Sequence, residues 1–287
     1  MRIQTVKNKI VWITGASSGI GEALAYAYAQ QGAKLILSAR NKAALEKVRD
    51  NCTPDENKIR ILPLDLSKVA TLNKKAKQAL KFFGKVDVMV HNAGVASRDL
   101  AANINTRTDQ KIMNTNYFGA VVLTKSLLPS MLKRKSGHFI VVSSVSGIYG
   151  VPKLSSYAAS KHALHGFFES LRAEVAKDKI KITMVVPGFV RTNITINALK
   201  GDGSKYGKMM AVQKKGQDPA HVAATILDAA SKNKEEVFIG RLERLGVYCK
   251  RIFPALFSII IRNHPIKKIR AVKNFFNLKK HIFRYEH

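Results

Sequence analysis

Three side chains in one short stretch of the sequence are suited to proton transfer. Ser144 precedes Tyr157 by thirteen residues, and Lys161 follows Tyr157 by four. A phenol titrates at about pH 10 in water and exchanges protons poorly at neutral pH. A neighbouring ammonium group favours the phenolate and lowers the pKa of the phenol, as acid–base catalysis near pH 7 requires. The stretch therefore predicts an acid–base site for a ketone or an alcohol, with the Ser144 hydroxyl gripping the carbonyl oxygen.

The elements that carry these residues follow from the apolar pattern. Within residues 155–175, apolar side chains recur at helical spacing, at Leu164, Phe167, Phe168, Leu171 and Val175. Residues four apart are neighbours on one face of a helix, so Tyr157 and Lys161 are expected to touch. Ser144 follows the apolar run 138–143, which predicts a buried strand. The pattern Tyr-x-x-x-Lys alone is weak, because ordinary helices often produce it.

A glycine-rich turn lies where a nucleotide phosphate would bind. The apolar run 9–14 is followed by Gly15, Gly19 and Gly21, and then by a helical stretch. Glycines let the backbone approach a pyrophosphate, and the N-terminus of the next helix offers free N–H groups and a positive dipole. After the first strand of an alternating chain, such a turn predicts a dinucleotide site.

Strands and helices alternate from the start of the chain. Short apolar runs predict strands at 9–14, 34–38, 59–64, 86–90, 138–143, 180–186 and 237–239. Helical patterns follow at 22–31, up to about residue 50, and at 69–83, 111–135, 155–175 and 219–231. This order is typical of a parallel sheet covered on both faces. We expect an α/β fold, a doubly wound parallel sheet of about seven strands in a domain over residues 1–240, with a basic helical extension over 241–287.

The formal charge of +30 at pH 7 is unusually large, and a third of it falls in residues 241–287. Such a field attracts phospholipid, nucleic acid or an acidic carrier protein, unless the basic residues merely solvate the surface. Residues 252–261 carry no charge but are too few to cross a bilayer, which takes about 20. Because cations flank them, they suit a segment lying at a membrane surface; a helix packed on the domain or on another subunit is the alternative.

The remaining composition indicates a reducing compartment. Cys52 and Cys249 lie far apart without metal or redox spacing, so we expect ordinary thiols. No pair of the eight histidines has ligand spacing backed by carboxylates, so no metal is predicted, and His162 and His165 are expected to be solvated or packed. The first nine residues lack the apolar core of a signal peptide. We therefore expect a cytoplasmic protein, peripheral at the cytoplasmic face of a membrane if the extension binds lipid.

Several motifs together resemble the short-chain dehydrogenase/reductase family over about residues 7–240. In chain order the matches are T-G-A-S-S-G-I-G at 14–21, Asp65, N-A-G at 92–94, Asn116, Ser144, Y-A-A-S-K at 157–161 and P-G-F-V-R-T at 187–192. The family commonly has asparagine where His91 stands, and we expect this departure to affect only strand packing. Within the family the chain most resembles the membrane-associated branch that reduces carbonyl groups of lipids.

The resemblance implies a role for each matching residue. Tyr157 would protonate the carbonyl oxygen as hydride arrives from the nicotinamide, and Lys161 would lower the phenol pKa and hold the nicotinamide ribose. Ser144 would polarise the carbonyl, and Asn116 would support a water relay to Lys161. Asp65 would meet the adenine amine. The implied cofactor-binding set is Gly15, Ser17, Ser18, Gly19, Ile20, Gly21, Arg40, Asp65, Leu66, Asn92, Ala93, Gly94, Tyr157, Lys161, Pro187, Gly188, Val190 and Thr192.

The end of the second predicted strand indicates which dinucleotide binds. An acidic residue there would bind the ribose 2′-hydroxyl of NAD, but Ala39 and Arg40 occupy the region. A guanidinium suits the 2′-phosphate of NADP, and the hydroxyls of Ser17 and Ser18 could add contacts to it. The sequence therefore predicts NADP(H) as the cofactor.

The leading hypothesis is an NADPH-dependent oxidoreductase that reduces a carbonyl to an alcohol, or the reverse, on a hydrophobic or lipid-like substrate. The substrate class follows from the extension and from a polar, glycine-rich flap at 201–216 that contains Met209 and Met210. One alternative is a 3-oxoacyl-thioester reductase that meets an acyl carrier. A second is a non-catalytic nucleotide-sensing or nucleic-acid-binding protein. The resemblance also implies a homodimer or homotetramer, assembled through the helices at 111–135 and 155–177.

Overall fold

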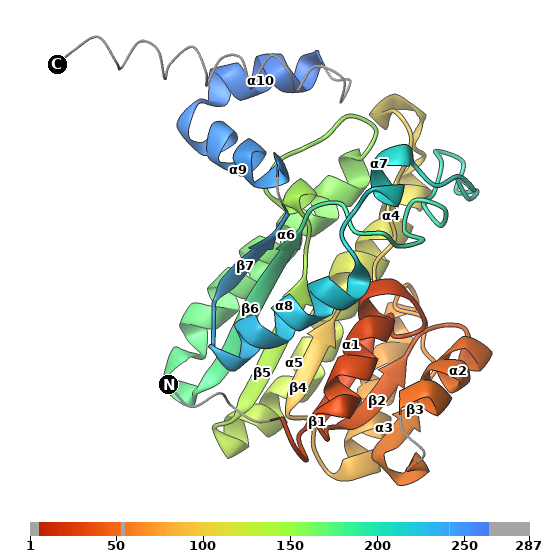
Figure 1. Cartoon of the computed structure of the whole chain (residues 1–287), viewed down its shortest axis with the longest axis vertical. Coiled ribbons are helices and arrows are strands. Elements are labelled where there is room, and N and C mark those ends of the chain that lie inside the picture. Colours follow the sequence, from red (N-terminus) through yellow and green to blue (C-terminus); the bar gives the residue numbers. More distant parts are fainter. Residues whose placement is uncertain (1–5, 53–54, 241, 264–287) are drawn as a thin grey trace, which may run out of the picture. The chain divides into compact units, whose positions relative to one another are not determined.

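The computed structural model describes residues 6–52, 55–240 and 242–263, and it divides the chain into two compact units, Met1–Arg244 and Leu245–His287. The first unit is built on one sheet of seven parallel strands in the order β3-β2-β1-β4-β5-β6-β7 (Figure 1). The strands are β1 (Ile10–Thr14), β2 (Lys34–Ser38), β3 (Ile59–Ile61), β4 (Val88–His91), β5 (Gly137–Val142), β6 (Ile180–Pro187) and β7 (Glu236–Ile239). The predicted doubly wound sheet is confirmed.

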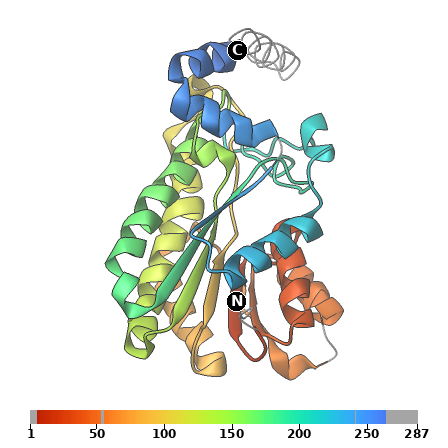
Figure 2. The ribbon, with the colours of Figure 1, turned by 60° about the vertical axis from the view of Figure 1, so that its left-hand side comes forward.

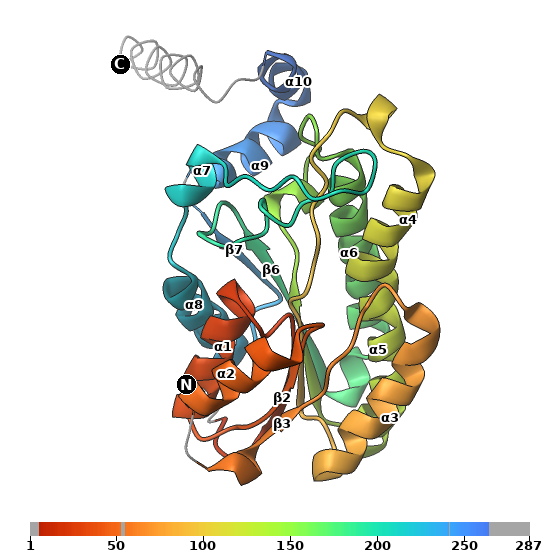
Figure 3. The same cartoon turned by 90° about the vertical axis from the view of Figure 1, so that its right-hand side faces the viewer.

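Helices cover both faces of this sheet, as Figures 2 and 3 show. One face packs against α1 (Gly19–Gln30), α2 (Lys42–Cys52) and α8 (Pro219–Ser231). The other packs against α3 (Leu72–Phe83), α5 (Gly119–Arg134) and α6 (Ser155–Glu174). Because both faces are covered, every residue of β1 is buried, which explains why this strand reads as an unbroken apolar run.

The long helix predicted at 111–135 is wrong in its start and its continuity. Helix α4 (Thr106–Met113) already begins five residues earlier, where the Asn105 side chain accepts from the Thr108 backbone N–H as an N-cap. A π-helical turn (Asn114–Phe118) then separates α4 from α5. Residues 98–110 are largely polar, so they carry no apolar stripe that would indicate a helix. A π-helical turn adds one residue without changing the apolar pattern enough to be seen.

Two shorter segments also differ from expectation. The third strand ends at Ile61 rather than at residue 64, although the N–H of Leu62 still bonds to the Leu37 carbonyl of β2, and that of Leu64 to the Ala39 carbonyl just after β2. The predicted flap contains a short helix, α7 (Ala211–Lys214), and Leu199 just before it forms bridges with both Ser97 and Lys205. The segment is therefore anchored to the loop that follows β4.

The second unit is helical over its described residues. The uncharged run at 252–261 is not one segment, because α9 (Leu242–Ile252) ends at its first residue and α10 (Pro254–Arg262) begins two residues later. Proline lacks a backbone donor and is favoured in the first turn of a helix, so Pro254 starts a new helix. None of the described helices is long and apolar enough to span a bilayer. The part of the predicted extension at 264–287 lies outside the described residues.

His91, the departure from the family pattern, is a packing residue at the end of β4. Its Nε2 lies 2.8 Å from the hydroxyl of Thr124, and its ring stacks on Phe139 with centroids 6.1 Å apart. Complete burial lowers the pKa of His91 to about 3, so the ring is neutral at physiological pH. The residue fills space between the sheet and α5, as we expected.

Candidate active site

The predicted site residues follow the carboxyl ends of the central strands, where open parallel sheets bind ligands. β1 leads into the glycine turn, β4 into Asn92–Gly94, β5 into Ser144, and β6 into the loop 188–192. Because β1, β4, β5 and β6 are adjacent in the sheet, these four loops lie next to one another. The strand order alone therefore gathers segments that are far apart in the sequence.

The glycine turn is fastened to the loop after β4. The side-chain Nδ2 of Asn92 donates to the carbonyl oxygens of Thr14 (3.0 Å) and Gly15 (3.3 Å). The Thr14 hydroxyl accepts from the backbone N–H groups of Asn92 (3.1 Å) and Ala93 (3.3 Å). A Cβ atom on Gly15 would lie 2.9 Å from Cα of Ala93, so only glycine allows this approach.

The N-terminus of α1 fits a pyrophosphate. Ser18 is its N-cap but makes no side-chain capping bond, so the N–H groups of the first turn remain available to a ligand. A Cβ atom on Gly21 would lie 2.2 Å from the carbonyl oxygen of Gly15, and Gly19 has a φ of +60°. A Cβ on Gly19 would also lie 2.8 Å from the Thr192 methyl group, which places the loop after β6 beside this turn. A dinucleotide pyrophosphate binds where glycines let the backbone at a helix N-terminus approach it closely. These residues therefore fit a dinucleotide cofactor.

Arg40 and Asp65 lie in the loops after β2 and β3. The Ser38 carbonyl accepts from the N–H of Ala16 at 3.1 Å, which holds the glycine turn beside the loop that carries Arg40. The Arg40 side chain is exposed and makes no hydrogen bond or ion pair within the described part of the chain. The Asp65 carboxylate accepts from the N–H (3.0 Å) and hydroxyl (2.8 Å) of Ser67 through Oδ1, so Oδ2 is left for a ligand donor.

The π-helical turn turns Asn116 toward the interior, where it is 2% exposed. Its Oδ1 accepts from the N–H of Val95 at 2.8 Å, and its Nδ2 donates to the Val95 carbonyl at 2.9 Å. Nδ2 also donates to the hydroxyl of Ser160 at 2.9 Å, and that hydroxyl donates to the Tyr157 carbonyl at 2.8 Å. Asn116 thus braces the loop after β4 against α6. Its part in a water relay to Lys161 stays a prediction.

Tyr157, Lys161 and Ser144 come together between the start of α6 and the end of β5, and all three are buried. The Lys161 ammonium lies 5.8 Å from the centroid of the Tyr157 ring and donates to the Val142 carbonyl at 2.7 Å. The Ser144 hydroxyl accepts from the N–H of Ser146 at 3.1 Å and hydrogen-bonds to the Tyr157 phenol. Since Ser144 accepts its bond from the backbone, its own proton can be donated to an oxygen atom, that of the phenol in this structure.

Burial, rather than the lysine, sets the pKa of the phenol. We expected Lys161 to bring the pKa of Tyr157 below 10, and in this structure that expectation is wrong. Burial raises the pKa of Tyr157 to about 12, and the hydrogen bond from Ser144 opposes it only in part. The Lys161 ammonium bonds to a carbonyl instead of the phenol, and burial lowers its own pKa to about 8. At pH 7 the phenol therefore holds its proton and can donate it.

Two residues that sequence reasoning missed hold the loop after β6. The Gln213 side-chain amide donates to the Val190 carbonyl. Glu243 accepts from the N–H of Phe189 at 3.1 Å, and a Cβ on Gly188 would lie 2.7 Å from its carboxyl carbon. Glu243 lies three residues beyond the predicted domain end at residue 240. No local pattern could have indicated either contact, because both join the loop to segments more than twenty residues away.

The sequence matches known proteins along most of its length. The family model described as "short chain dehydrogenase" matches residues 9–202. A relative from Anopheles gambiae, named "Dehydrogenase/reductase SDR family protein 7-like", is 40% identical over 268 residues. The match covers 91% of this chain and 84% of that protein.

Solved structures share the fold. An alcohol dehydrogenase from the archaeon Thermococcus sibiricus, complexed with 5-hydroxy-NADP, is 28% identical with a TM-score of 0.70, covering 81% of this chain and 96% of that one. A short chain dehydrogenase/reductase from Burkholderia phymatum, in complex with NAD, is 22% identical with a TM-score of 0.79, covering 88% and 96%. The two neighbours hold different nicotinamide dinucleotides.

Gly21→Ala is expected to abolish dinucleotide binding, because the new methyl group would collide with the Gly15 carbonyl and displace the turn. Calorimetric titration with NADPH and with NADH measures the loss. The matched control is Gly166→Ala on α6, where nothing lies within 4 Å of an added Cβ. There binding should stay unchanged while stability rises by about 0.5–1 kcal/mol. A folded Gly21→Ala variant with normal affinity would contradict the assignment of this turn.

Proposed function

The chain belongs to the short-chain dehydrogenase/reductase family, and we propose that within it the protein is an NADPH-dependent reductase of hydrophobic, lipid-like carbonyl compounds. Membership supports an oxidoreductase acting on CH–OH and C=O groups with a nicotinamide cofactor. The observation that carries the reaction is the buried group of Ser144, Tyr157 and Lys161 beside the glycine turn. The cofactor choice and the substrate class rest on further residues.

The chain's own groups divide the work of the reduction. A bound nicotinamide supplies the hydride for the carbonyl carbon. The Ser144 hydroxyl, held by the N–H of Ser146, donates to the carbonyl oxygen and orients it. The Tyr157 phenol, protonated at neutral pH, then gives its proton to the same oxygen. Lys161, cationic beside the phenol, stabilises the negative charge that develops there, and its own proton can restore the phenol.

Arg40 supports the choice of NADPH. Its guanidinium follows the end of β2, it is exposed, and it has no partner within the described residues. Such a cation suits a 2′-phosphate, and no acidic residue stands at this position to bind a 2′-hydroxyl. Ser17 and Ser18 lie in the neighbouring glycine turn and can donate hydroxyl contacts to the same group.

The surroundings of the phenol support a hydrophobic substrate. Tyr157 packs in a small apolar cluster with Ala96 and Ala198, joined by side chains from the loop before α6 and from the segment after β6. The half-buried methionines Met209 and Met210 lie in the same region of the chain as that segment. An oxygen atom reduced there would be flanked by apolar carbon, as a lipid carbonyl would be.

The second unit supports delivery from an anionic membrane surface. Its helices expose large apolar side chains, including Ile252 (63%) and Ile259 (56%), and they carry the exposed cations Arg251 and Arg262. Apolar groups mixed with cations are typical of helices that lie in a membrane interface. The proposal also includes a homo-oligomer in the cytoplasm, assembled through the helix faces of α5 and α6, as the family resemblance implies.

Tyr157→Phe should lower the turnover of an aliphatic ketone or aldehyde with NADPH by about a thousandfold, because the proton donor is removed. The dissociation constant for NADPH should stay within about twofold, since the ring remains. Tyr26→Phe is the matched control: its hydroxyl bonds to Glu22 on α1, at 2.8 Å, and to none of the site residues, so turnover should not change. Retained turnover in a folded Tyr157→Phe variant would exclude this mechanism.

Arg40→Ala should weaken NADPH binding by about tenfold or more and leave NADH binding unchanged, because only NADPH carries the 2′-phosphate. Lys42→Ala is the control, since this nearby cation is exposed and already paired with Glu46 at 3.4 Å. Fluorescence titration with both dinucleotides measures the effect. Equal affinity of the native chain for NADH and NADPH, with no loss in Arg40→Ala, would reject the NADPH assignment.

The paired substitution Ile252→Asp with Ile259→Asp should prevent the chain from floating with vesicles rich in phosphatidylserine, because it places charge on the apolar surface. The native chain should float, and less so as salt rises. Leu100→Asp, at a side chain 52% exposed in the first unit, should float like the native chain. Binding to an acidic acyl carrier protein instead of vesicles would favour the thioester reductase alternative.

A further inference from the structure

A buried histidine lies directly behind the catalytic lysine. His165 follows Lys161 by one helical turn on α6 and is only 7% exposed. Its Nε2 lies 2.9 Å from the hydroxyl oxygen of Ser143, and that hydroxyl donates to the backbone carbonyl of Lys161 at 3.5 Å. Ser143 is the neighbour of Ser144 in sequence, so the imidazole is linked through one hydroxyl to the Lys161 carbonyl and to the residue beside Ser144.

The packing leaves little room for these groups to move. A Cβ atom on Gly147, three residues after Ser144, would lie 2.5 Å from the Ser143 hydroxyl and 3.0 Å from the Lys161 carbonyl. It would also lie 3.1 Å from Cδ2 of His165. The turn after β5, the hydroxyl, the carbonyl and the imidazole therefore meet at one point.

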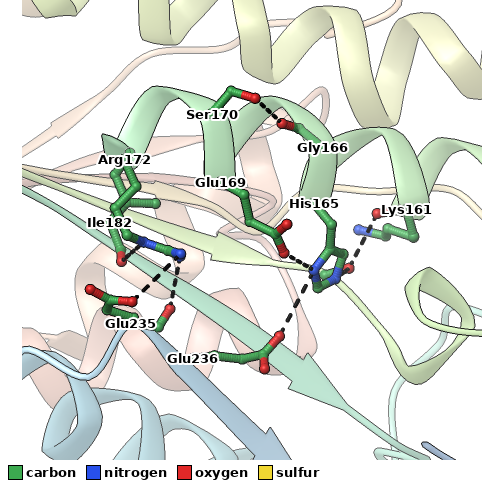
Figure 4. Close-up of polar contacts among 10 residues, drawn as sticks. Lys161, His165, Gly166, Glu169, Ser170, Arg172, Ile182, Glu235 and Glu236 are labelled. Atoms are coloured by element: carbon green, nitrogen blue, oxygen red, sulfur yellow. Dashed lines mark hydrogen bonds and ion pairs between the residues drawn. The ribbon is translucent and has the colours of Figure 1, made fainter. Parts of the chain in front are cut away.

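The other ring nitrogen faces two carboxylates. Nδ1 of His165 lies 3.5 Å from Oε1 of Glu169 on α6 and 3.9 Å from Oε1 of Glu236 on β7, as Figure 4 shows. It is buried and accepts or donates no hydrogen bond of normal geometry within the described part of the chain. Burial lowers the pKa of His165, Glu169 opposes this effect, and the neighbouring His162 and Lys161 add to the lowering. A second proton on the ring, at Nδ1, would place a positive charge beside both carboxylates.

While the His165 imidazole is neutral, its single ring proton lies on Nε2 or on Nδ1, and each tautomer gives a different hydrogen-bond pattern. With the proton on Nε2, His165 donates to Ser143, and the Ser143 hydroxyl donates to the Lys161 carbonyl. With the proton on Nδ1, Nε2 accepts the Ser143 proton, and the bond to the carbonyl is lost. When both nitrogens are protonated, both donate, and only the first arrangement remains.

We propose that His165 is a positioning residue of the active site, whose protonation between Glu169 and Glu236 fixes the Ser143 hydroxyl on the Lys161 carbonyl. The inference rests on the proposed reductase function for its kinetic effect, but the proton switch itself does not. As pH falls through the pKa of His165, the backbone of Lys161 and Ser144 becomes locked in the arrangement that serves catalysis. The imidazole acts through Ser143 and touches neither substrate nor cofactor.

Substitutions that keep or remove the hydrogen bond between His165 Nε2 and Ser143 test the kinetic effect. His165→Gln keeps a donor near the position of Nε2, so kcat should stay within about twofold of the native value at pH 5.5. His165→Asn and Ser143→Ala lose the bond, and kcat should fall about tenfold, with little change in KM, because the lysine is misplaced. His162→Gln, at an exposed histidine on the same helix, keeps the His165–Ser143 bond, so kcat at pH 5.5 should stay within about twofold of the native value. A loss in His165→Gln equal to that in His165→Asn would overturn the proposal.

The pH profile supplies a readout that a purely structural role would not move. From pH 7.5 down to the lowest pH at which the chain stays folded, the native kcat should rise relative to that of His165→Gln, because only the native chain gains the second proton. Since burial lowers the pKa of His165, the rise should come below pH 6.5. Glu169→Gln removes a carboxylate that favours this proton, so the rise should move to lower pH. A constant ratio between native and His165→Gln rates across this range would contradict the switch.

Nitrogen NMR of the full chain separates this proposal from the reductase assignment. With labelled histidine, and with His165→Gln to identify the signal, Nδ1 of His165 should gain a proton as pH falls, while Nε2 stays protonated. This outcome is expected whether or not any carbonyl is reduced, so a failed activity assay leaves the measurement decisive. A His165 ring that stays singly protonated down to the pH at which the chain unfolds would overturn the proposal.

Discussion

The candidate site depends on one buried cation. Lys161 is 3% exposed, and its ammonium donates a hydrogen bond to the Val142 carbonyl at the end of β5. Removing a charge from water is costly unless it is hydrogen-bonded, so the strand end and the helix that carries the lysine must stay in fixed register. The same burial holds the proton on the Tyr157 phenol. The burial that makes the Lys161 charge costly therefore also keeps the Tyr157 phenol protonated and able to donate its proton.

The loops around this cation approach one another only because side chains are missing at a few points. Gly15 and Gly21 allow the turn after β1 to meet the Asn92 loop, and Gly147 allows the turn after β5 to meet α6. The hydrogen bonds of Asn92 and Asn116 then hold the approach. Fixed backbone contacts keep the acid, the lysine and the dinucleotide turn together without large motions of the sheet.

Sequence patterns predicted most of this arrangement, because the buried strands of a parallel sheet leave clear apolar runs in the sequence. Buried strands carry unbroken apolar runs, such as residues 35–37 of β2. The glycine turn and the serine, tyrosine and lysine stand at strand ends or helix starts. Packing between distant segments could not be predicted. The contacts of Glu243 with Phe189 and of His165 with Ser143 leave no local pattern in the sequence. The same holds for the bond of the Lys161 ammonium to the Val142 carbonyl, which draws the ammonium away from the phenol.

The π-helical turn at Asn114–Phe118 has a consequence for how the chain can vary. One extra residue in a turn rotates everything that follows by about 100° relative to a regular helix. Deleting a single residue there would give a more regular helix with better backbone hydrogen bonds, yet it would swing the Asn116 amide away from Val95. A regular helix at this point would therefore cost the hydrogen bonds between Asn116 and Val95. An insertion or deletion in this turn is far less tolerable than most side-chain replacements.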